Sequence, residues 1–167
     1  YENIRFGRDV SKKEAMAAAQ DAQAVEFIEE KGIDTMLAIR GMDLSGGQKQ
    51  RISIARALIT NPELLILDDA LSAVDAKTEE VILSNLKAYR QNKTTIIAAH
   101  RLSSVMHAQE IIVLDEGRIV ERGVHETLIT TGGWYQKMWE KQQLEAKSKG
   151  EKNDGKKAIR MGNINAL

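Results

Sequence analysis

Two short polar clusters and one histidine carry the chemistry that this sequence could perform. The first cluster is Ser-Gly-Gly-Gln at residues 45–48, placed directly ahead of apolar residues at helical spacing. A serine hydroxyl and unhindered glycine amides at a helix start can bind phosphate, because the helix dipole favours negative charge there. A Ser-Gly-Gly turn is also common in flexible turns, so its meaning depends on the sequence around it.

The second cluster is an acidic pair, Asp68 and Asp69, which follows the apolar run of residues 64–67. A short continuous apolar run suits a parallel strand covered on both faces, and ligands bind at the carboxyl ends of such strands. Adjacent carboxylates repel each other unless a cation offsets their charge. The pair therefore indicates a site that holds Mg²⁺ and orients a water. His100 follows a second strand-like segment, residues 94–99, although an isolated histidine is more often structural than catalytic.

The elements that would hold these residues alternate between helix and strand, which predicts an α/β fold with a mainly parallel sheet. The Ser11–Glu14 capping box begins the first predicted helix. Helices are expected at residues 15–20, 21–30, 45–59, 78–90, 124–129 and 134–145, with a short helix after Ser103. Strands are expected at residues 64–67, 94–99, 110–114 and 119–121, the last two joined by a hairpin turn.

Composition narrows the class of protein. The chain has 167 residues, of which 43% are apolar, and its 24 basic residues balance its 24 acidic residues. With 4% aromatic residues and no net charge, no nucleic-acid partner is expected. There is no cysteine, and no apolar stretch approaches the ~20 residues that span a bilayer. The first residue is Tyr1 instead of Met, so we expect that a preceding segment has been lost.

Residues 44–57 closely resemble the signature motif of ATP-binding cassette (ABC) transporter nucleotide-binding domains. In that family the motif crosses a dimer interface and contacts the γ-phosphate of ATP held by the partner domain. The resemblance implies that Ser45, Gly46 and Gly47 make this contact and that Gln48 borders it. It also implies ATP and Mg²⁺ as cofactors and a second nucleotide-binding domain as a partner.

The acidic pair resembles the Walker B motif of the same family, with Asp68 organising Mg²⁺. Asp69 stands where the family usually has the glutamate that polarises the attacking water. Aspartate is shorter by one methylene, so we expect slow hydrolysis at this site. The pattern resembles the degenerate-site subunit of heterodimeric multidrug exporters, which keeps an intact signature motif and gives it to the competent site.

Two further motifs follow from the resemblance. Residues 72–75 resemble the D-loop, which communicates between the two ATP sites, although Asp75 is by itself typical of a helix cap. His100 resembles the H-loop switch for the γ-phosphate. Residues 35–41 occupy the place of an exporter loop that contacts the membrane domain, with Met36 and Ile39 where glutamates are expected.

The resemblance predicts an incomplete P-loop ATPase core with part of the helical signature subdomain. Residues 1–60 would end that subdomain and include the signature helix, residues 61–145 would form the second half of the core, and residues 146–167 would be a basic disordered tail. No glycine-rich phosphate loop precedes the signature sequence, so the chain alone is predicted to be inactive. Residues 150–157 match a phosphate-loop spacing but follow no strand, and Lys157 replaces the hydroxyl residue.

The parent protein would couple ATP hydrolysis to export through a transmembrane domain, with this domain at the cytoplasmic face of the cell membrane. Two alternatives remain open. A soluble ABC ATPase without transport would carry long coiled-coil insertions or a tandem cassette, and the short spacing from Ser45 to His100 disfavours the insertions. A non-functional gene fragment would show a stop codon or frame break upstream of Tyr1.

Overall fold

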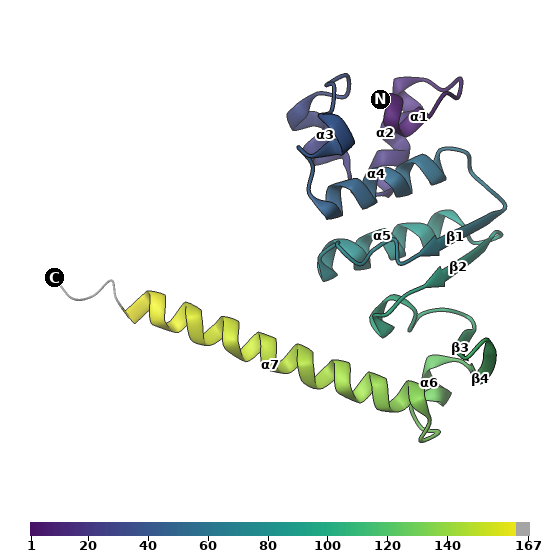
Figure 1. Cartoon of the computed structure of the whole chain (residues 1–167), viewed down its shortest axis with the longest axis vertical. Helices are drawn as coiled ribbons and strands as arrows, with labels where there is room; N and C mark the ends of the chain where they lie inside the picture. Colours follow the sequence, from purple (N-terminus) through teal and green to yellow (C-terminus); the bar gives the residue numbers. More distant parts are fainter. Residues whose placement is uncertain (163–167) are drawn as a thin grey trace. The chain divides into compact units, whose positions relative to one another are not determined.

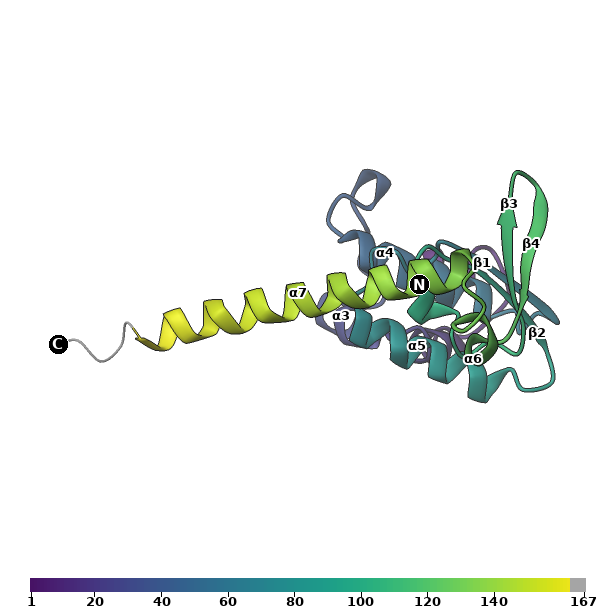
Figure 2. The same ribbon diagram turned by 90° about the horizontal axis from the view of Figure 1, so that it is seen from below.

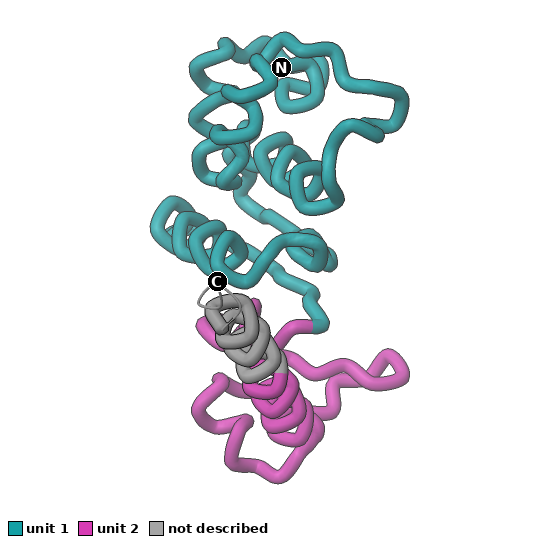
Figure 3. Tube along the Cα trace, turned by 90° about the vertical axis from the view of Figure 1, so that its left-hand side faces the viewer, with its two compact units in different colours: residues 1–100 teal, residues 101–167 magenta. Residues whose placement is uncertain are grey.

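A computed structural model describes the backbone of residues 1–162 and the side chains of residues 1–148. The chain divides into two compact units, residues 1–100 and 101–167 (Figure 3). The boundary therefore follows His100 and does not coincide with the motif-based division after residue 60. That division stays a prediction about function.

Unit 1 contains the candidate site residues on helices and two strands (Figure 1). Its elements are α1 (Glu2–Arg5), α2 (Lys12–Asp21), α3 (Val25–Lys31), η1 (Ile39–Gly41), α4 (Gly46–Leu58), β1 (Leu64–Asp68), α5 (Ala76–Tyr89) and β2 (Thr94–Ala98). The predicted α/β character is confirmed.

The helix starts follow local capping chemistry. Ser11 forms a capping box with Glu14 at the start of α2, as the sequence predicts. The second helix expected at residues 21–30 is present as α3, but it begins later than predicted, at Val25, because α2 continues to Asp21. Gln23, between them, has φ +54°, a left-handed conformation that neither helix can include.

The strands β1 and β2 pair in parallel, with Leu64 opposite Thr94 and Asp68 opposite Ala98. Helix α5 makes the crossover between them. The predicted burial of β1 on both faces is wrong: Leu65 and Leu67 are buried, whereas Ile66 is 60% exposed. Exposed and buried side chains alternate along β1, so one face of the strand packs against the core of unit 1.

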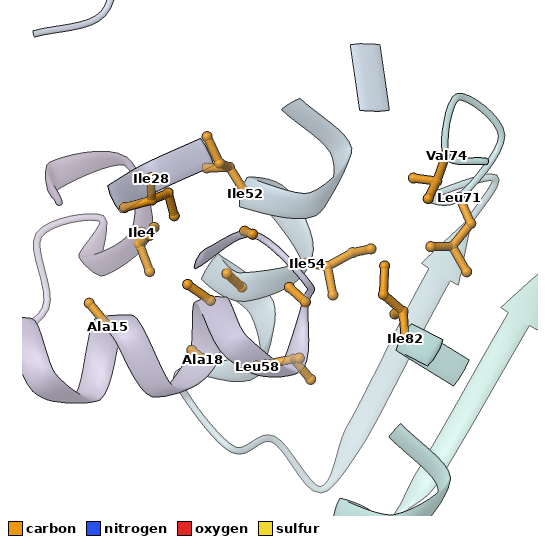
Figure 4. Packing of buried hydrophobic residues seen from close by; sticks show 14 of the residues in the cluster. Ile4, Ala15, Ala18, Ile28, Ile52, Ile54, Leu58, Leu71, Val74 and Ile82 are labelled. Carbon is orange, nitrogen blue, oxygen red and sulfur yellow. The ribbon is translucent and has the colours of Figure 1, made fainter. Parts of the chain in front are cut away.

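The core of unit 1 lies around α4. Ile54, on α4, points toward Ile82, on α5, and Leu71 and Val74 from the loop after β1 lie beside them (Figure 4). Ile54 is 1% exposed and Ile82 is fully buried. Burial of one such side chain contributes about 1.5–3 kcal/mol, so these contacts hold α4 against the loop that follows β1.

Unit 2 is built on a hairpin and a long helix (Figure 2). Its elements are η2 (Leu102–Ser104), β3 (Ile111–Asp115), β4 (Arg118–Gly123), α6 (His125–Leu128) and α7 (Trp134–Gly162). The antiparallel β3–β4 hairpin is confirmed. Helix α7 extends past Glu145, the predicted end, so residues 146–162 are helical where disorder was predicted. Residues 163–167 of the predicted tail lie outside the described residues, as do the side chains of residues 150–157.

A buried polar pair fixes the start of α7 within unit 2. The hydroxyl of Tyr135 lies 3.0 Å from Nδ1 of His125, and both side chains are buried. The Glu121 carboxylate accepts a hydrogen bond from the amide of Trp134, at 2.5 Å, in the first turn of α7. The prediction that His125 is structural agrees with this burial.

Candidate nucleotide site

The Ser-Gly-Gly-Gln turn is the N-terminus of helix α4. The Ser45 hydroxyl oxygen accepts a hydrogen bond from the amide of Gln48 at 3.2 Å, and the Ser45 amide donates to Oε1 of Gln48 at 2.9 Å. This capping box uses the Ser45 hydroxyl as an acceptor only, so its O–H can still donate to an anion. The side-chain NH₂ of Gln48 is likewise outside the capping box.

The amides of Gly46 and Gly47 precede the first hydrogen bond of the helix, which runs from Lys49 to the carbonyl of Ser45 at 3.0 Å. Helix-start amides of this kind carry the positive end of the helix dipole. The turn is exposed at Ser45 and Gly46. Its donors can therefore receive a phosphate from outside this chain.

Both glycines also lie against the loop after β1. A Cβ atom on Gly46 would lie 3.3 Å from Cβ of Ala73, and one on Gly47 would lie 2.7 Å from the carbonyl oxygen of Ala73. The second distance is too short for any side chain. Gly47 is therefore required by packing within the domain, in addition to any contact with phosphate.

The predicted metal and catalytic residues gather at one edge of the parallel pair. Asp68 is the last residue of β1, and Asp69 follows it with φ +48°. The amide of Asp69 donates to the carbonyl of Ala98, the last residue of β2, at 2.9 Å. His100 lies two residues further on, so both strands deliver their polar residues at their carboxyl ends.

These residues fit Mg²⁺. Magnesium is usually held by one or two carboxylates together with waters and substrate phosphates, rather than by a full protein cage. Asp68 and Asp69 are both exposed and supply hard oxygen ligands. The described residues contain no group of three or more His, Cys, Asp or Glu side chains that could hold a metal ion.

Asp75 is the N-cap of α5. Its carboxylate accepts a hydrogen bond from the amide of Thr78 at 3.0 Å. That backbone bond, together with the Thr78 hydroxyl, holds the pKa of Asp75 below its usual value. The cap interpretation is confirmed, and the D-loop role of Asp75 stays a prediction.

Sequence reasoning missed the role of Gln50. Its Nε2 donates to Oγ of Ser72 at 2.9 Å and to the carbonyl of Asp69 at 3.2 Å, while its Oε1 accepts from the amide of Ala73 at 2.8 Å. Gln50 is one helical turn after Gly47, which places both on the same face of α4. That spacing was the available signal.

The segment before the signature turn exposes apolar side chains. Met36 is 92% exposed, Ile39 is 80% exposed and Met42 is 76% exposed. The segment is a loop with one short 3₁₀ turn, η1, as expected. A pocket of about 520 Å³ lies next to it and is lined by residues of this loop, α1 and α4.

The family model for the ABC transporter matches residues 1–72 of the chain. Among curated proteins, the probable multidrug resistance ABC transporter ATP-binding/permease protein YheI of Bacillus subtilis is 52% identical over 86% of this chain and 25% of its own length. The multidrug resistance-like ATP-binding protein MdlA of Escherichia coli is 59% identical over 70% of this chain and 20% of its own length. The chain thus spans about a quarter of the length of these relatives.

A solved structure also supports this family assignment. A bacterial Atm1-family ABC exporter with ATP bound superimposes with a TM-score of 0.80 and 46% identity, over 85% of this chain and 26% of that exporter chain. The fold and its motifs define part of a nucleotide-binding ATPase domain. The chain belongs to the ATP-binding domains of ABC transporters, and its relatives include an Atm1-family ABC exporter.

None of the helices within the described residues is both long enough and apolar enough to cross a bilayer.

Proposed function

We propose that this chain is the part of an ABC exporter that gives its signature turn to the ATP site of a second nucleotide-binding domain. Ser45, Gly46, Gly47 and Gln48 would contact the γ-phosphate of that ATP. The observation that carries the proposal is the geometry of α4. Ser45 and Gly46 are exposed at its N-terminus, where a serine hydroxyl and helix-start amides could donate to a phosphate.

A second ATP would bind at the carboxyl ends of the parallel strands β1 and β2. Asp68 would hold Mg²⁺, Asp69 would orient the attacking water, and His100 would contact the γ-phosphate. Bound Mg²⁺ neutralises the charge that develops on the transferred phosphoryl group. The placement of all three residues at the carboxyl ends of adjacent strands supports this assignment.

We propose that this second site hydrolyses ATP slowly. A carboxylate one methylene shorter than the usual glutamate would leave its oxygens about 1.5 Å short of the position from which glutamate orients the attacking water. A misplacement of about 1 Å can cost about 10²-fold in rate. The site would bind nucleotide and leave most turnover to the partner, which favours a heterodimer.

The test is an exchange of domains. The aligned part of this chain would replace its counterpart in the Atm1-family exporter, and ATP hydrolysis would be measured in proteoliposomes with and without Asp68→Asn. We expect slow, Mg²⁺-dependent hydrolysis that Asp68→Asn abolishes. Hydrolysis of equal rate with and without Asp68→Asn would contradict the metal assignment.

Asp69→Glu in the same exchanged exporter tests the degenerate site. We expect turnover to rise by about 10- to 100-fold, because the longer carboxylate reaches the water. Asp69→Asn is the matched control and should not rise. If Asp69→Glu hydrolyses ATP at the rate of the unmodified exchange, the missing methylene does not limit the site.

The chain by itself should neither bind ATP tightly nor hydrolyse it. Within its sequence no glycine-rich phosphate loop stands before the signature turn, and phosphate loops supply most contacts to the β- and γ-phosphates in P-loop ATPases. Calorimetric titration of residues 1–167 with MgATP measures this directly. A dissociation constant in the micromolar range would overturn the proposal.

The remaining partner is a transmembrane domain, which would hold this domain at the cytoplasmic face of the membrane. The exposed side chains of Met36, Ile39 and Met42 support a contact with an apolar helix end. A purely electrostatic contact is disfavoured because the glutamates expected at Met36 and Ile39 are absent.

A further inference from the structure

Gln50 joins the signature helix to the loop after β1 by three hydrogen bonds. Its amide donates to the carbonyl of Asp69 and to the Ser72 hydroxyl, and it accepts from the amide of Ala73. The Ser72 hydroxyl donates in turn to the carbonyl of Asp69 at 3.0 Å. One side chain therefore satisfies polar groups at both ends of the loop.

The backbone of Asp69 is held on both sides. Its amide donates to the carbonyl of Ala98 on β2, and its carbonyl accepts from Gln50 on α4. The residue sits at φ +48°, in the left-handed region that non-glycine residues occupy uncommonly and aspartate more readily than most. Fixing both peptide groups fixes the direction in which the Asp69 side chain leaves the backbone.

Gly47 closes the same contact one turn earlier. The carbonyl of Ala73 lies against its Cα, so the loop cannot slide along α4 without meeting the helix backbone. The Gln50 side chain is half-buried, which shields its hydrogen bonds from water. The signature helix and the loop are thus joined in unit 1 by both close packing and hydrogen bonds.

We propose that Gln50 is a positioning residue that sets the orientation of the Asp69 carboxylate and ties it to the position of the signature turn. The inference rests on the proposed function only in giving Asp69 its water-orienting role. Movement of the signature turn, when it binds or releases the phosphate of the second domain, would then move Asp69 through Gln50.

The structural half of the proposal is tested on the chain itself by amide hydrogen exchange. Gln50→Leu removes all three bonds, and we expect the Ala73 amide to exchange at least about 10-fold faster. Gln50→Glu keeps an acceptor for Ala73 and loses the donors to Asp69, so the Ala73 amide should stay protected. Gln20→Leu, at an exposed position of α2, is the matched control and should leave Ala73 unchanged.

If hydrogen exchange became faster to the same extent at the Ala73 amide and at the core amides of α4, the substitution would have caused global unfolding. That result would overturn the proposal that Gln50 holds the loop locally. Unchanged exchange at Ala73 in Gln50→Leu would overturn it as well. Gln50→Glu keeps the acceptor for the Ala73 amide, so faster exchange at Ala73 in that variant would also overturn the proposal.

The functional half is tested in the exchanged exporter described above. We expect both Gln50→Leu and Gln50→Glu to lower kcat about 10-fold with little change in KM for ATP, because both remove the hydrogen bond that joins α4 to the carbonyl of Asp69. If Gln50→Glu has the same kcat as the exchanged exporter without that substitution, Gln50 is a structural residue only and its positioning role is overturned. If the exchanged exporter hydrolyses no ATP, with either Asp69 or Asp69→Glu, the proposed function is rejected. The amide hydrogen exchange of Ala73 would still test whether Gln50 holds the loop after β1.

Discussion

The carbonyl oxygen of Ala73 lies 2.7 Å from the position that a Cβ atom on Gly47 would occupy. Gly47 therefore has two roles. Its amide is among the helix-start donors, and its lack of a side chain lets the loop after β1 contact α4. The family resemblance accounts only for the amide donor, because the resemblance concerns contact with the phosphate of ATP bound by the partner domain. The second is a constraint within this domain.

Gly47→Ala should destabilise unit 1 by about 1–3 kcal/mol, because either the helix or the loop must move to relieve the overlap. Alanine is otherwise the better helix former, so a loss of stability has the opposite sign to helix propensity. Urea denaturation of the chain measures the free energy of unfolding. Gly46→Ala is the control: its Cβ would meet only Cβ of Ala73 at 3.3 Å, and we expect a change below about 0.5 kcal/mol. Equal effects of the two substitutions would argue against the overlap.

The helix cap at Asp75 should make stability depend on pH in a predictable direction. Folding lowers the pKa of Asp75, mainly through the hydrogen bond from the Thr78 amide, so folding favours the ionised form. The stabilisation is complete above the usual aspartate pKa of about 3.9 and is lost as the pH falls through the lower folded value. Asp75→Asn keeps a cap oxygen without titrating. The stability difference between wild type and Asp75→Asn should therefore fall on acidification from pH 7 to below pH 4, and a difference that is constant with pH would contradict this account.

The hydroxyl of Tyr135 should stabilise unit 2 through its contact with His125. Tyr135→Phe leaves Nδ1 of His125 buried without this partner, which should cost about 1–3 kcal/mol. Denaturation followed by the fluorescence of the tryptophans in α7 reports on this unit. Tyr89→Phe is the matched control, because Tyr89 is 52% exposed and should give no measurable change. Similar losses in both variants would show that the buried pair is not responsible.

Local signals in the sequence predicted the parts of the fold that depend on neighbouring residues. The capping box at Ser11, the helix start at Ser45 and the hairpin at residues 115–118 all arise from contacts within four residues. The strand ends at Asp68 and Ala98 were also recovered to within a residue, because apolar runs of this length are bounded by polar residues. These elements place the acidic pair and His100.

Features that depend on distant residues could not be predicted. The helical spacing places Gln50 on the same face of α4 as Gly47, but its partners lie 19 to 23 positions away and the spacing does not identify them. The run 64–67 is apolar throughout, so its sequence could not reveal that Ile66 is exposed in this chain. Gln23 adopts a positive φ although helix formers surround it, and tertiary packing of α2 and α3 overrides their propensity.

The exposed apolar side chains before the signature turn give a last prediction, on coupling to the transmembrane domain. In the exchanged exporter, Met36→Glu combined with Ile39→Glu should weaken substrate-stimulated ATP hydrolysis if an apolar helix end contacts them, because two charges would then need to be desolvated. Basal hydrolysis should change little, since neither residue lies at the strand ends that carry Asp68 and His100. Lys13→Glu, on the exposed surface of α2, controls for added negative charge. Increased stimulation in the double variant would show instead that the contact is electrostatic and that this chain had lost part of it.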